Sequence, residues 1–472
     1  MDRTFAMLID GAAVAGAGNF PVINPATGRP FAHCPHADRA LLDRAVAAGV
    51  AAFPRWAATP VDDRAALVAR LADALATRAD EFAALLTAEQ GKPLAQAGHE
   101  VAGAVETLRA FAAMRPESRV LRDDGRARIV EHRTPLGVVA AIVPWNYPLL
   151  LLMNKIGPGL VAGNCIVAKP APTTPLTALL FGEICRELLP PGVVNIICDR
   201  NDLGDALTGH SDIAMLSFTG STATGRKVMA AGAQAIRRVS LELGGNDAAI
   251  VLDDADPVVA ARRIFAGAMM NAGQVCVAIK RAYVPETMME PFCDELVRLA
   301  QAHVVDNGAR QGAQMGPLQN AAQYEKVKAL LAETAEQGRV LAGGAAIDRP
   351  GYFIAPTIVR DLPDDARLVR EEQFGPVLPV LSYSDIDEAV ARADAGVYGL
   401  GGSVWGHDVD RAAQVAMRMG SGTVWINQHA ALDAAIPFRG ARQSGMGGDL
   451  GQDGLHEYTQ AHIVNIALGR GV

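Results

Sequence analysis

The chain has 472 residues, of which half are apolar and a fifth are charged, and its formal net charge is −8. This length exceeds one hydrophobic core, so the composition indicates a globular α/β protein of two or three domains. The acidic balance argues against a nucleic-acid partner, and six cysteines without a C-x-x-C pair indicate a reducing compartment.

Neither a targeting segment nor a membrane span is expected. The first residues, Met1-Asp-Arg-Thr, have no basic flank before a long apolar stretch. The most apolar run, 149–163, is interrupted by Asn154, Lys155 and Pro158. We therefore expect a soluble, cytoplasmic protein without a membrane partner.

The first quarter of the chain predicts strands and then helices. A turn-rich stretch, 8–35, is strand-like, and Asp38 is placed to cap the helix that follows it. Leu67, Leu71 and Leu75 repeat every four residues, as one buried helix face requires. The predicted helices cover 38–52, 62–89 and 94–114.

The charged stretch 118–132 is too polar for a core strand and predicts a projecting hairpin. Beyond it, short apolar runs alternate with helix patterns, which predicts a parallel sheet in a doubly wound fold. A second alternation runs from about 248 to 426, and 461–468 predict a terminal strand. The first set of predicted strands covers 137–143, 165–168, 193–197 and 214–218, and its helices cover 155–162, 176–189 and 203–210.

One motif has the pattern of a phosphate site. Gly220, Ser221 and Gly225 follow an apolar strand and open a helix, and their small size lets backbone N–H groups approach a phosphate. The motif is not the G-x-G-x-x-G dinucleotide fingerprint, so a plain strand–helix turn remains an alternative.

Three polar residues stand out in apolar surroundings. Asn146 lies in the turn after a buried strand, where it can donate to an oxyanion or bond its own backbone. Glu242 is a lone carboxylate in an apolar strand, placed for general-base chemistry or for a buried ion pair. Cys276 lies in a glycine-containing turn beyond a helix, with no His beside it.

These motifs, in this order, resemble the aldehyde dehydrogenase superfamily over essentially the whole chain. The motifs that carry the resemblance are Asp10-Gly11, Asn-Pro-Ala-Thr-Gly at 24–28, Pro144-Trp-Asn146, Phe218-Thr-Gly220-Ser-Thr, Glu242-Leu-Gly-Gly245, Gly273-Gln-Val-Cys276, Glu371-Glu-Gln-Phe374-Gly-Pro376, Gly422-Thr-Val-Trp-Ile-Asn427, and a tail with Pro437-Phe438, Gln443-Ser-Gly445, Gly454-Leu455 and Tyr458-Thr459.

The resemblance implies an α/β fold of three parts that assembles as a homodimer or homotetramer. A Rossmann-like cofactor domain would comprise 1–117 and 136–243, and an α/β catalytic domain would comprise 244–445. A small β oligomerisation element would comprise 118–135 and 459–472.

The resemblance also implies a mechanism without a metal ion. Cys276 would attack the aldehyde carbon, while Asn146 and the Cys276 backbone N–H stabilise the oxyanion. Glu242 would activate water to hydrolyse the thioester. Lys155 would relay protons, although it fits equally well as a structural cation.

The implied cofactor is NAD or NADP. Lys169 would bond to the adenosine ribose, and Glu372 would hold the nicotinamide ribose with Phe374 packed beside it. The cofactor-binding residues implied are Trp145, Lys169, Pro172, Gly220, Ser221, Gly225, Glu372 and Phe374.

The sequence departs from the family pattern at four places. Pro172 replaces a Glu common in NAD-preferring members, and Cys198-Asp-Arg200 fills a stretch that is commonly Gly-rich. Arg439 replaces a Gly, and Gly448-Asp449 replaces Arg-Glu. Because Pro172 cannot repel a 2′-phosphate while Lys169 and Arg200 are cations, we expect both NAD and NADP to be used with a modest preference.

The substrate pocket implied by the motifs is mostly apolar, which favours a neutral aldehyde. Its residues are Tyr147, Asn154, Met270, Val275, Val277, Leu432 and Phe438. An alternative is a semialdehyde dehydrogenase that holds a distal carboxylate through Arg439 or His429. Asn154 and Met270 argue against it, because the family's succinate-semialdehyde enzymes carry arginines there. A coenzyme A-acylating enzyme would lack Glu242, and a non-catalytic relative would have lost Cys276, Glu242 or Asn146.

Overall fold

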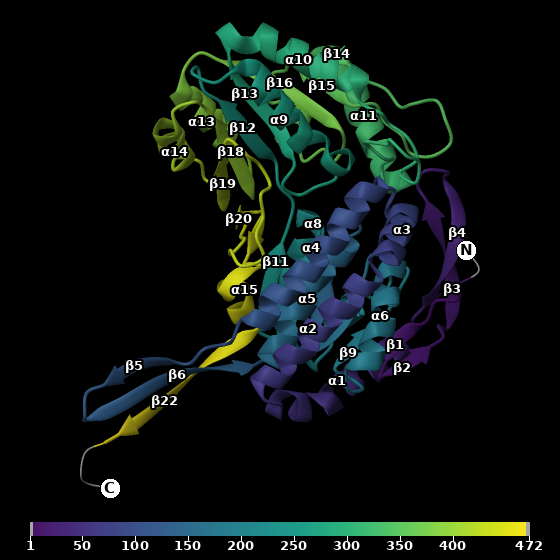
Figure 1. Ribbon diagram of the computed structural model, residues 1–472, viewed down its shortest axis with the longest axis vertical. Coiled ribbons are helices and arrows are strands. Elements are labelled where there is room, and N and C mark those ends of the chain that lie inside the picture. The colour runs from purple at the N-terminus through teal and green to yellow at the C-terminus, as the bar shows by residue number, and fades with distance from the viewer. Residues whose placement is uncertain (1–2, 469–472) are drawn as a thin grey trace.

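The computed structural model describes residues 3–468, and its first sheet lies in the lower part of the body (Figure 1). The strands of this sheet are β1 (Met7–Ile9), β2 (Ala12–Val14), β7 (Val138–Ile142), β8 (Cys165–Lys169), β9 (Val194–Ile196), β10 (Ile213–Thr219), β11 (Arg238–Glu242) and β21 (Gly445–Met446). Their order is β2-β1-β9-β8-β7-β10-β11-β21. The strands from β9 to β11 run parallel, which confirms the predicted parallel sheet.

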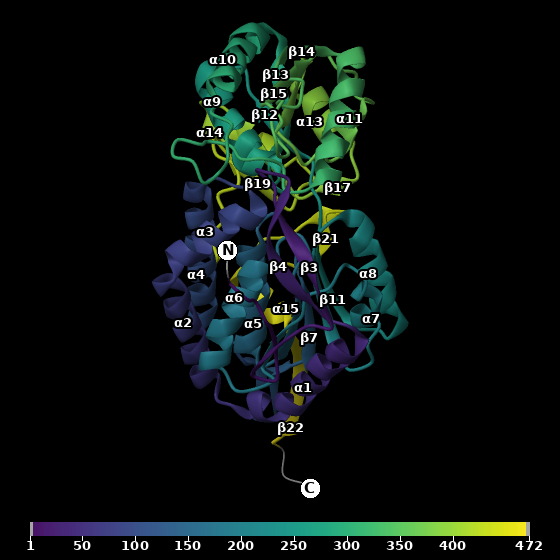
Figure 2. The ribbon, with the colours of Figure 1, turned by 90° about the vertical axis from the view of Figure 1, so that its right-hand side faces the viewer.

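Helices cover both faces of this sheet. They are α1 (Arg39–Ala58), α2 (Val61–Thr77), α3 (Ala79–Gln90), α4 (Leu94–Ala113), α5 (Pro148–Ala162), α6 (Leu176–Leu188), α7 (Gly204–Thr208) and α8 (Thr222–Gln234). Figure 2 places α2, α3 and α4 on one side of the sheet and α7 and α8 on the other. Asp38 caps α1 as predicted, since its carboxylate accepts the backbone N–H of Leu41 at 2.9 Å.

The predicted helix over 62–89 is wrong in one respect, because the chain breaks it into α2 and α3. The break is at Arg78, whose backbone leaves the helical region at φ −111° and ψ 17°. The Arg78 guanidinium donates to Glu81 at 2.8 Å and to Glu183 at 3.1 Å. The leucines that recur at every fourth residue end inside α2. The apolar periodicity therefore could not predict that the chain changes direction at Arg78.

The second sheet forms the upper part of the body. Its strands, in spatial order, are β14 (Arg339–Ala342), β15 (Thr357–Arg360), β16 (Val377–Tyr383), β13 (Ile279–Pro285), β12 (Asp247–Val251), β18 (Gly401–Trp405) and β19 (Thr423–Ile426). All but β14 run parallel to their neighbours. Ala248 and Ile250 of β12 join one apolar cluster and Ala249 and Val251 another, so the sheet is buried on both faces.

The other elements of this half are α9 (Pro257–Met269), η1 (Met270–Gly273), η2 (Glu286–Met288), α10 (Met289–Ala302), α11 (Ala321–Gln337), α12 (Arg367–Arg370), α13 (Ile386–Asp394), β17 (Tyr398–Gly399), α14 (Val409–Ala416) and β20 (Ala441–Arg442). The last helix, α15 (Gly451–Glu457), packs against α4 and α5 in the lower half (Figure 1). Near the N-terminus, β3 (Gly18–Asn24) and β4 (Arg29–His36) form a hairpin. No helix among residues 3–468 is long and apolar enough to cross a membrane.

A three-stranded antiparallel arm projects from the body (Figure 1). It consists of β5 (Arg119–Asp123), β6 (Ala127–Pro135) and β22 (Thr459–Ala467). The predicted hairpin and terminal strand are therefore confirmed, and β22 begins two residues earlier than the predicted 461. Apolar side chains such as Val120, Leu121 and Ile463 are exposed on the arm. Residues 469–472 of the expected oligomerisation element lie outside the described residues.

Candidate active site

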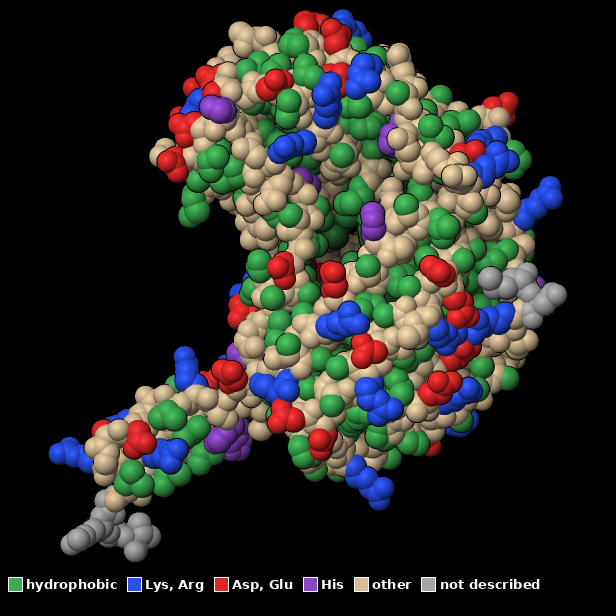
Figure 3. All heavy atoms as spheres, in the orientation of Figure 1, with side chains coloured by type: hydrophobic (Ala, Val, Ile, Leu, Met, Phe, Trp, Pro, Cys, Tyr) green, Lys and Arg blue, Asp and Glu red, His purple; other side chains and the backbone are tan. Residues whose placement is uncertain are grey.

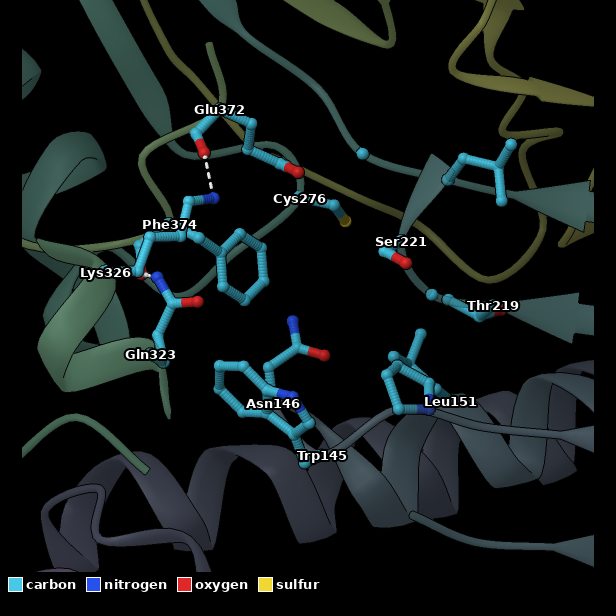
Figure 4. Close-up of a pocket in the computed structure, with 14 residues that line it drawn as sticks. Trp145, Asn146, Leu151, Thr219, Ser221, Cys276, Gln323, Lys326, Glu372 and Phe374 are labelled. Atoms are coloured by element: carbon cyan, nitrogen blue, oxygen red, sulfur yellow. Dashed lines mark hydrogen bonds between the residues drawn. The ribbon is translucent and has the colours of Figure 1, made fainter. Parts of the chain in front are cut away.

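A cavity of about 190 Å³ lies where the carboxyl ends of β7, β10 and β11 face the loops of the second sheet (Figure 4). Figure 3 shows the surface hollowed between the two halves of the body. The residues that line the cavity are Pro144, Trp145, Asn146, Leu151, Thr219, Gly220, Ser221, Leu243, Gly244, Cys276, Gln323, Lys326, Glu372 and Phe374. The cavity thus joins four motifs that are far apart in the sequence.

The turn that carries Cys276 has an unusual backbone. Asn271, Ala272 and Gly273 adopt left-handed conformations in succession, with φ of 49°, 55° and 71°. A Cβ on Gly273 would lie 2.1 Å from the carbonyl oxygen of Gly375, so only glycine fits there. The Asn271 amide donates to the Asn146 carbonyl oxygen at 3.1 Å and thereby ties the two loops together.

Asn146 is buried and aims its amide nitrogen into the cavity (Figure 4). One N–H of the amide donates to the Gln274 carbonyl oxygen at 3.0 Å, not to its own turn. The amide carries two N–H groups, and the second remains for a ligand in the cavity. The Cys276 backbone N–H has no acceptor among residues 3–468. These two donors and the thiol therefore lie at one cavity.

Lys92 fixes the position of the loop that carries Asn146, and the sequence analysis did not predict this role. Its ammonium donates to the Asn146 carbonyl oxygen at 2.9 Å, pairs with the buried Glu100 and lies 3.6 Å from the centre of the Tyr147 ring. Glu100 also accepts the Leu149 backbone N–H at the start of α5, at 3.0 Å. Lys92 lies in a loop after α3, where no periodicity indicates burial.

The thiol of Cys276 is the reactive candidate among the six cysteines, since the other five are buried. Burial raises the pKa of Cys276 to about 12, and the nearby Lys280 ammonium acts against this rise. Lys280 Nζ donates to the carbonyl oxygens of Val275 at 2.9 Å and Cys276 at 2.6 Å. It also lies 3.8 Å from Glu372 Oε1, so one buried cation contacts both the thiol loop and a predicted cofactor residue.

Replacing Lys280 by methionine should raise the pH at which the Cys276 thiol reacts. A nearby opposite charge typically lowers a pKa by about 1–3 units, so its loss moves the alkylation profile up by about one unit or more. The measurement is iodoacetamide labelling of the Cys276 peptide against pH, followed by mass spectrometry. Lys326→Met is the control, because Lys326 also lines the cavity but, among residues 3–468, its ammonium donates only to the Glu372 carbonyl oxygen, at 2.8 Å. Equal shifts in both variants would contradict this role.

Glu242 and Lys155 do not line the cavity but lie in a buried cluster beside it. Neither Glu242 oxygen nor Lys155 Nζ has a hydrogen-bond partner among the described residues. Lys155 Nζ lies 4.0 Å from Asp449 Oδ2. Burial, followed by the like charge of Asp449, raises the pKa of Glu242 well above its ordinary value. Among the described residues Glu242 forms no ion pair, so the buried ion pair that was the alternative for this residue is not found.

The two glycines after Glu242 make room for the predicted cofactor residue Glu372. A Cβ on Gly244 would lie 2.3 Å from Glu372 Oε2, and the Gly245 N–H donates to Glu372 Oε1 at 2.9 Å. Phe374 packs edge-on against Trp145 with ring centroids 5.4 Å apart. Gln323 and Lys326 of α11 donate to backbone carbonyls of this loop, and both were missed by sequence reasoning because α11 carries no motif.

A second pocket of about 390 Å³ continues the cavity along α8. It shares Trp145, Gly220 and Ser221 with the first cavity and adds Lys169 and Pro172. The pocket therefore runs past the N-terminus of α8, which suits the pyrophosphate of a dinucleotide. Lys169, the backbone N–H groups at the start of α8 and the space beside Glu372 together fit NAD or NADP.

Two residues of the predicted phosphate motif have mainly structural contacts. The Gly225 Cα packs against Leu243, since a Cβ there would lie 2.5 Å from a Leu243 methyl carbon. Ser221 caps α8, as its hydroxyl accepts the Thr224 N–H at 3.2 Å. Arg200, expected near the cofactor, instead donates to the Asn19 carbonyl oxygen at 2.8 Å.

None of the seven predicted substrate residues lines the cavity of Figure 4. Six of them are buried or half-buried, and Leu432 is 48% exposed. Asn154 is buried with an unpaired carbonyl oxygen. Leu151, one helical turn beyond Tyr147, lines the cavity instead and could have been found from the four-residue spacing.

Comparison with known proteins places the chain in a family. The sequence model described as "Aldehyde dehydrogenase family" matches residues 13–464. A probable aldehyde dehydrogenase from a Pseudomonas species is 40% identical over 98% of this chain and 94% of its own length. The NAD+ complex of an aldehyde dehydrogenase from Bacillus cereus has a TM-score of 0.97 at 35% identity, over 99% of this chain and 97% of that one. An NADP-dependent enzyme from E. coli has a TM-score of 0.95 at 33% identity, over 98% of both chains.

The chain belongs to the aldehyde dehydrogenase family. It is therefore an NAD(P)-dependent oxidoreductase that acts on aldehydes, as the sequence resemblance implied.

Proposed function

We propose that this enzyme oxidises a neutral aldehyde to a carboxylic acid through a thioester on Cys276. The observation that carries the proposal is that the Cys276 thiol and the Asn146 amide face one cavity, with the unbonded Glu242 buried beside it. The Cys276 thiolate attacks the aldehyde carbon and forms a thiohemiacetal oxyanion. The second N–H of Asn146 and the Cys276 backbone N–H stabilise that oxyanion.

Bound NAD or NADP supplies the acceptor for the hydride that leaves the thiohemiacetal carbon. Glu372 and Trp145 would orient the nicotinamide end, the start of α8 would hold the pyrophosphate, and Lys169 would hold the adenosine end. The remaining thioester is hydrolysed by water that Glu242 deprotonates. Its raised pKa makes the Glu242 carboxylate a stronger base than an exposed one. Lys155 and Asp449 are placed to pass the proton onward.

We also propose the three-part division given by the resemblance, with 1–117 and 136–243 binding the cofactor, 244–445 carrying Cys276, and 118–135 with 459–472 joining subunits of a homo-oligomer. Exposed apolar residues of the arm, such as Val120 and Ile463, support the last assignment.

The alternative, a semialdehyde dehydrogenase, loses support from the contacts of its two candidate anchors. Arg439 is exposed and pairs with Asp453. His429 Nε2 donates to the Val277 carbonyl oxygen at 2.6 Å, and burial lowers the pKa of His429 to about 4. The His429 ring is therefore uncharged at neutral pH and attracts no carboxylate.

Succinate semialdehyde should consequently be a poorer substrate than a neutral aldehyde of similar length, such as butanal. Burying a carboxylate without a partner cation costs several kcal/mol, so kcat/KM should differ by at least about tenfold. The assay follows absorbance of the reduced cofactor and identifies the acid product. Arg439→Gly serves as a control and should leave the ratio unchanged. A preference for the semialdehyde that disappears in Arg439→Gly would instead support the alternative, and no oxidation of any aldehyde in a broad panel would refute the proposed function.

A further inference from the structure

A buried ion pair lies beneath the adenosine end of the proposed cofactor pocket. Lys169 Nζ donates to Asp199 Oδ1 at 2.7 Å. The side chain of Asp199 is 0% exposed and that of Lys169 is 6% exposed. The second carboxylate oxygen of Asp199 accepts the Leu203 N–H at 2.9 Å, just before α7. Because both oxygens are held, the carboxylate is fixed against the lysine.

This ion pair reduces the positive charge near a cofactor bound in the pocket. The pocket is lined by Lys169, Lys227 and Asp205 as its charged side chains. Lys227 and Asp205 are exposed and of opposite sign, so solvent and salt screen them. Lys169 is the buried cation, and its charge is offset at contact distance by Asp199. The sequence-based expectation of a modest cofactor preference counted Lys169 as a cation and did not include the Asp199 carboxylate that pairs with it.

Pro172 gives this pocket no charge of its own. It lines the pocket, but its side chain can neither accept hydrogen bonds from ribose hydroxyls nor repel a phosphate. A 2′-phosphate carries up to about two negative charges and needs an uncompensated cation to repay its desolvation. Two ribose hydroxyls need only donors and acceptors, which the two remaining N–H groups of Lys169 supply in part.

We propose that Asp199 is a specificity-determining residue that directs this enzyme toward NAD by neutralising Lys169. The proposal rests on the proposed cofactor site. Asp199 acts through Lys169 and does not line the pocket itself, so it is a positioning residue. By offsetting the Lys169 charge, Asp199 removes the buried cation that would otherwise stabilise a 2′-phosphate in this pocket.

The first test is calorimetric binding of NAD+ and NADP+ to the wild-type enzyme, without aldehyde. NAD+ should bind at least about tenfold more tightly than NADP+, the size of effect expected from one buried charge. Equal affinity or an NADP+ preference would overturn the role of Asp199 whatever its variants do. If neither nucleotide bound, the proposed cofactor site itself would be wrong, which separates the two failures.

The second test uses Asp199→Asn, which keeps the shape and an acceptor for Leu203 while removing the charge. The ratio of NADP+ to NAD+ affinity should rise at least about tenfold. The matched control is Asp202→Asn, because Asp202 is exposed, lies in the same loop and contacts His36 at 3.2 Å. It should change the ratio by less than about threefold.

A double-mutant cycle then separates charge compensation from a general loosening of the loop. In the Lys169→Gln background, Asp199→Asn should no longer change the ratio, because the cation that Asp199 offsets is gone. The ratio is a readout that loss of stability does not move, since both cofactors share the folded protein. A shift that persists without Lys169, or an equal shift in Asp202→Asn, would contradict the proposal.

Discussion

The Cys276→Ala variant is expected to lose aldehyde oxidation, with kcat at least about 10⁴-fold below the wild type. Cys276 is the one cysteine that is not fully buried, and it lies at the cavity that also holds Asn146. Removal of the nucleophile leaves neither a thiohemiacetal nor a thioester, so the oxyanion donors have no intermediate to stabilise. Cofactor affinity should stay within a few-fold, because Glu372 and Lys169 keep their contacts.

The measurement is turnover by absorbance of the reduced cofactor, together with calorimetric binding of NAD+. Cys293→Ala is the control, since Cys293 is a buried thiol of α10 that does not line the cavity. It should retain turnover within a few-fold. Near wild-type turnover in Cys276→Ala would show that another group is the nucleophile.

The Glu242→Gln variant should transfer hydride but stall at the thioester. Both Glu242 oxygens lack a hydrogen-bond partner among residues 3–468, so no protein group occupies the lone pairs that a general base uses. Glutamine is of the same size but accepts no proton, so steady-state kcat should fall by about 10²–10⁴-fold. Pre-steady-state kinetics should give a burst of reduced cofactor, and mass spectrometry should find an acyl group on Cys276.

The pH dependence of deacylation gives a second readout for Glu242. Burial and Asp449 raise the pKa of Glu242, so its basic form is lost at a higher pH than for an exposed glutamate. Wild-type deacylation should therefore slow as pH falls, and this dependence should vanish in Glu242→Gln. Glu457→Gln is the control, because Glu457 lies near the same cluster but is only half-buried. If Glu242→Gln slowed the hydride step itself and accumulated no acyl-enzyme, the main role of Glu242 would be to activate the thiol.

The order of the motifs along the sequence was enough to predict the family and the two central residues of the site, Asn146 and Cys276. Asn146 and Cys276 were predicted from local sequence, and the structure brings them to one cavity. Local rules also gave the Asp38 cap, the parallel strands and the projecting hairpin, because caps and alternating apolar runs depend on neighbours within a few residues. The break at Arg78 was missed, because its bond to Glu183 crosses more than a hundred residues.

Which charged groups lie next to one another at the site could be learned only from the tertiary structure. Asp199 and Lys169 are thirty residues apart, but Lys169 ends β8 and Asp199 follows β9, and the carboxyl ends of these adjacent parallel strands meet at one edge. The cluster of Glu242, Lys155 and Asp449 likewise comes from three distant segments. The strength of a charge interaction depends on distance through space and on burial, and neither is written in sequence spacing. The sequence by itself thus determined which chemistry the chain carries, and the packed structure decided which charges surround it.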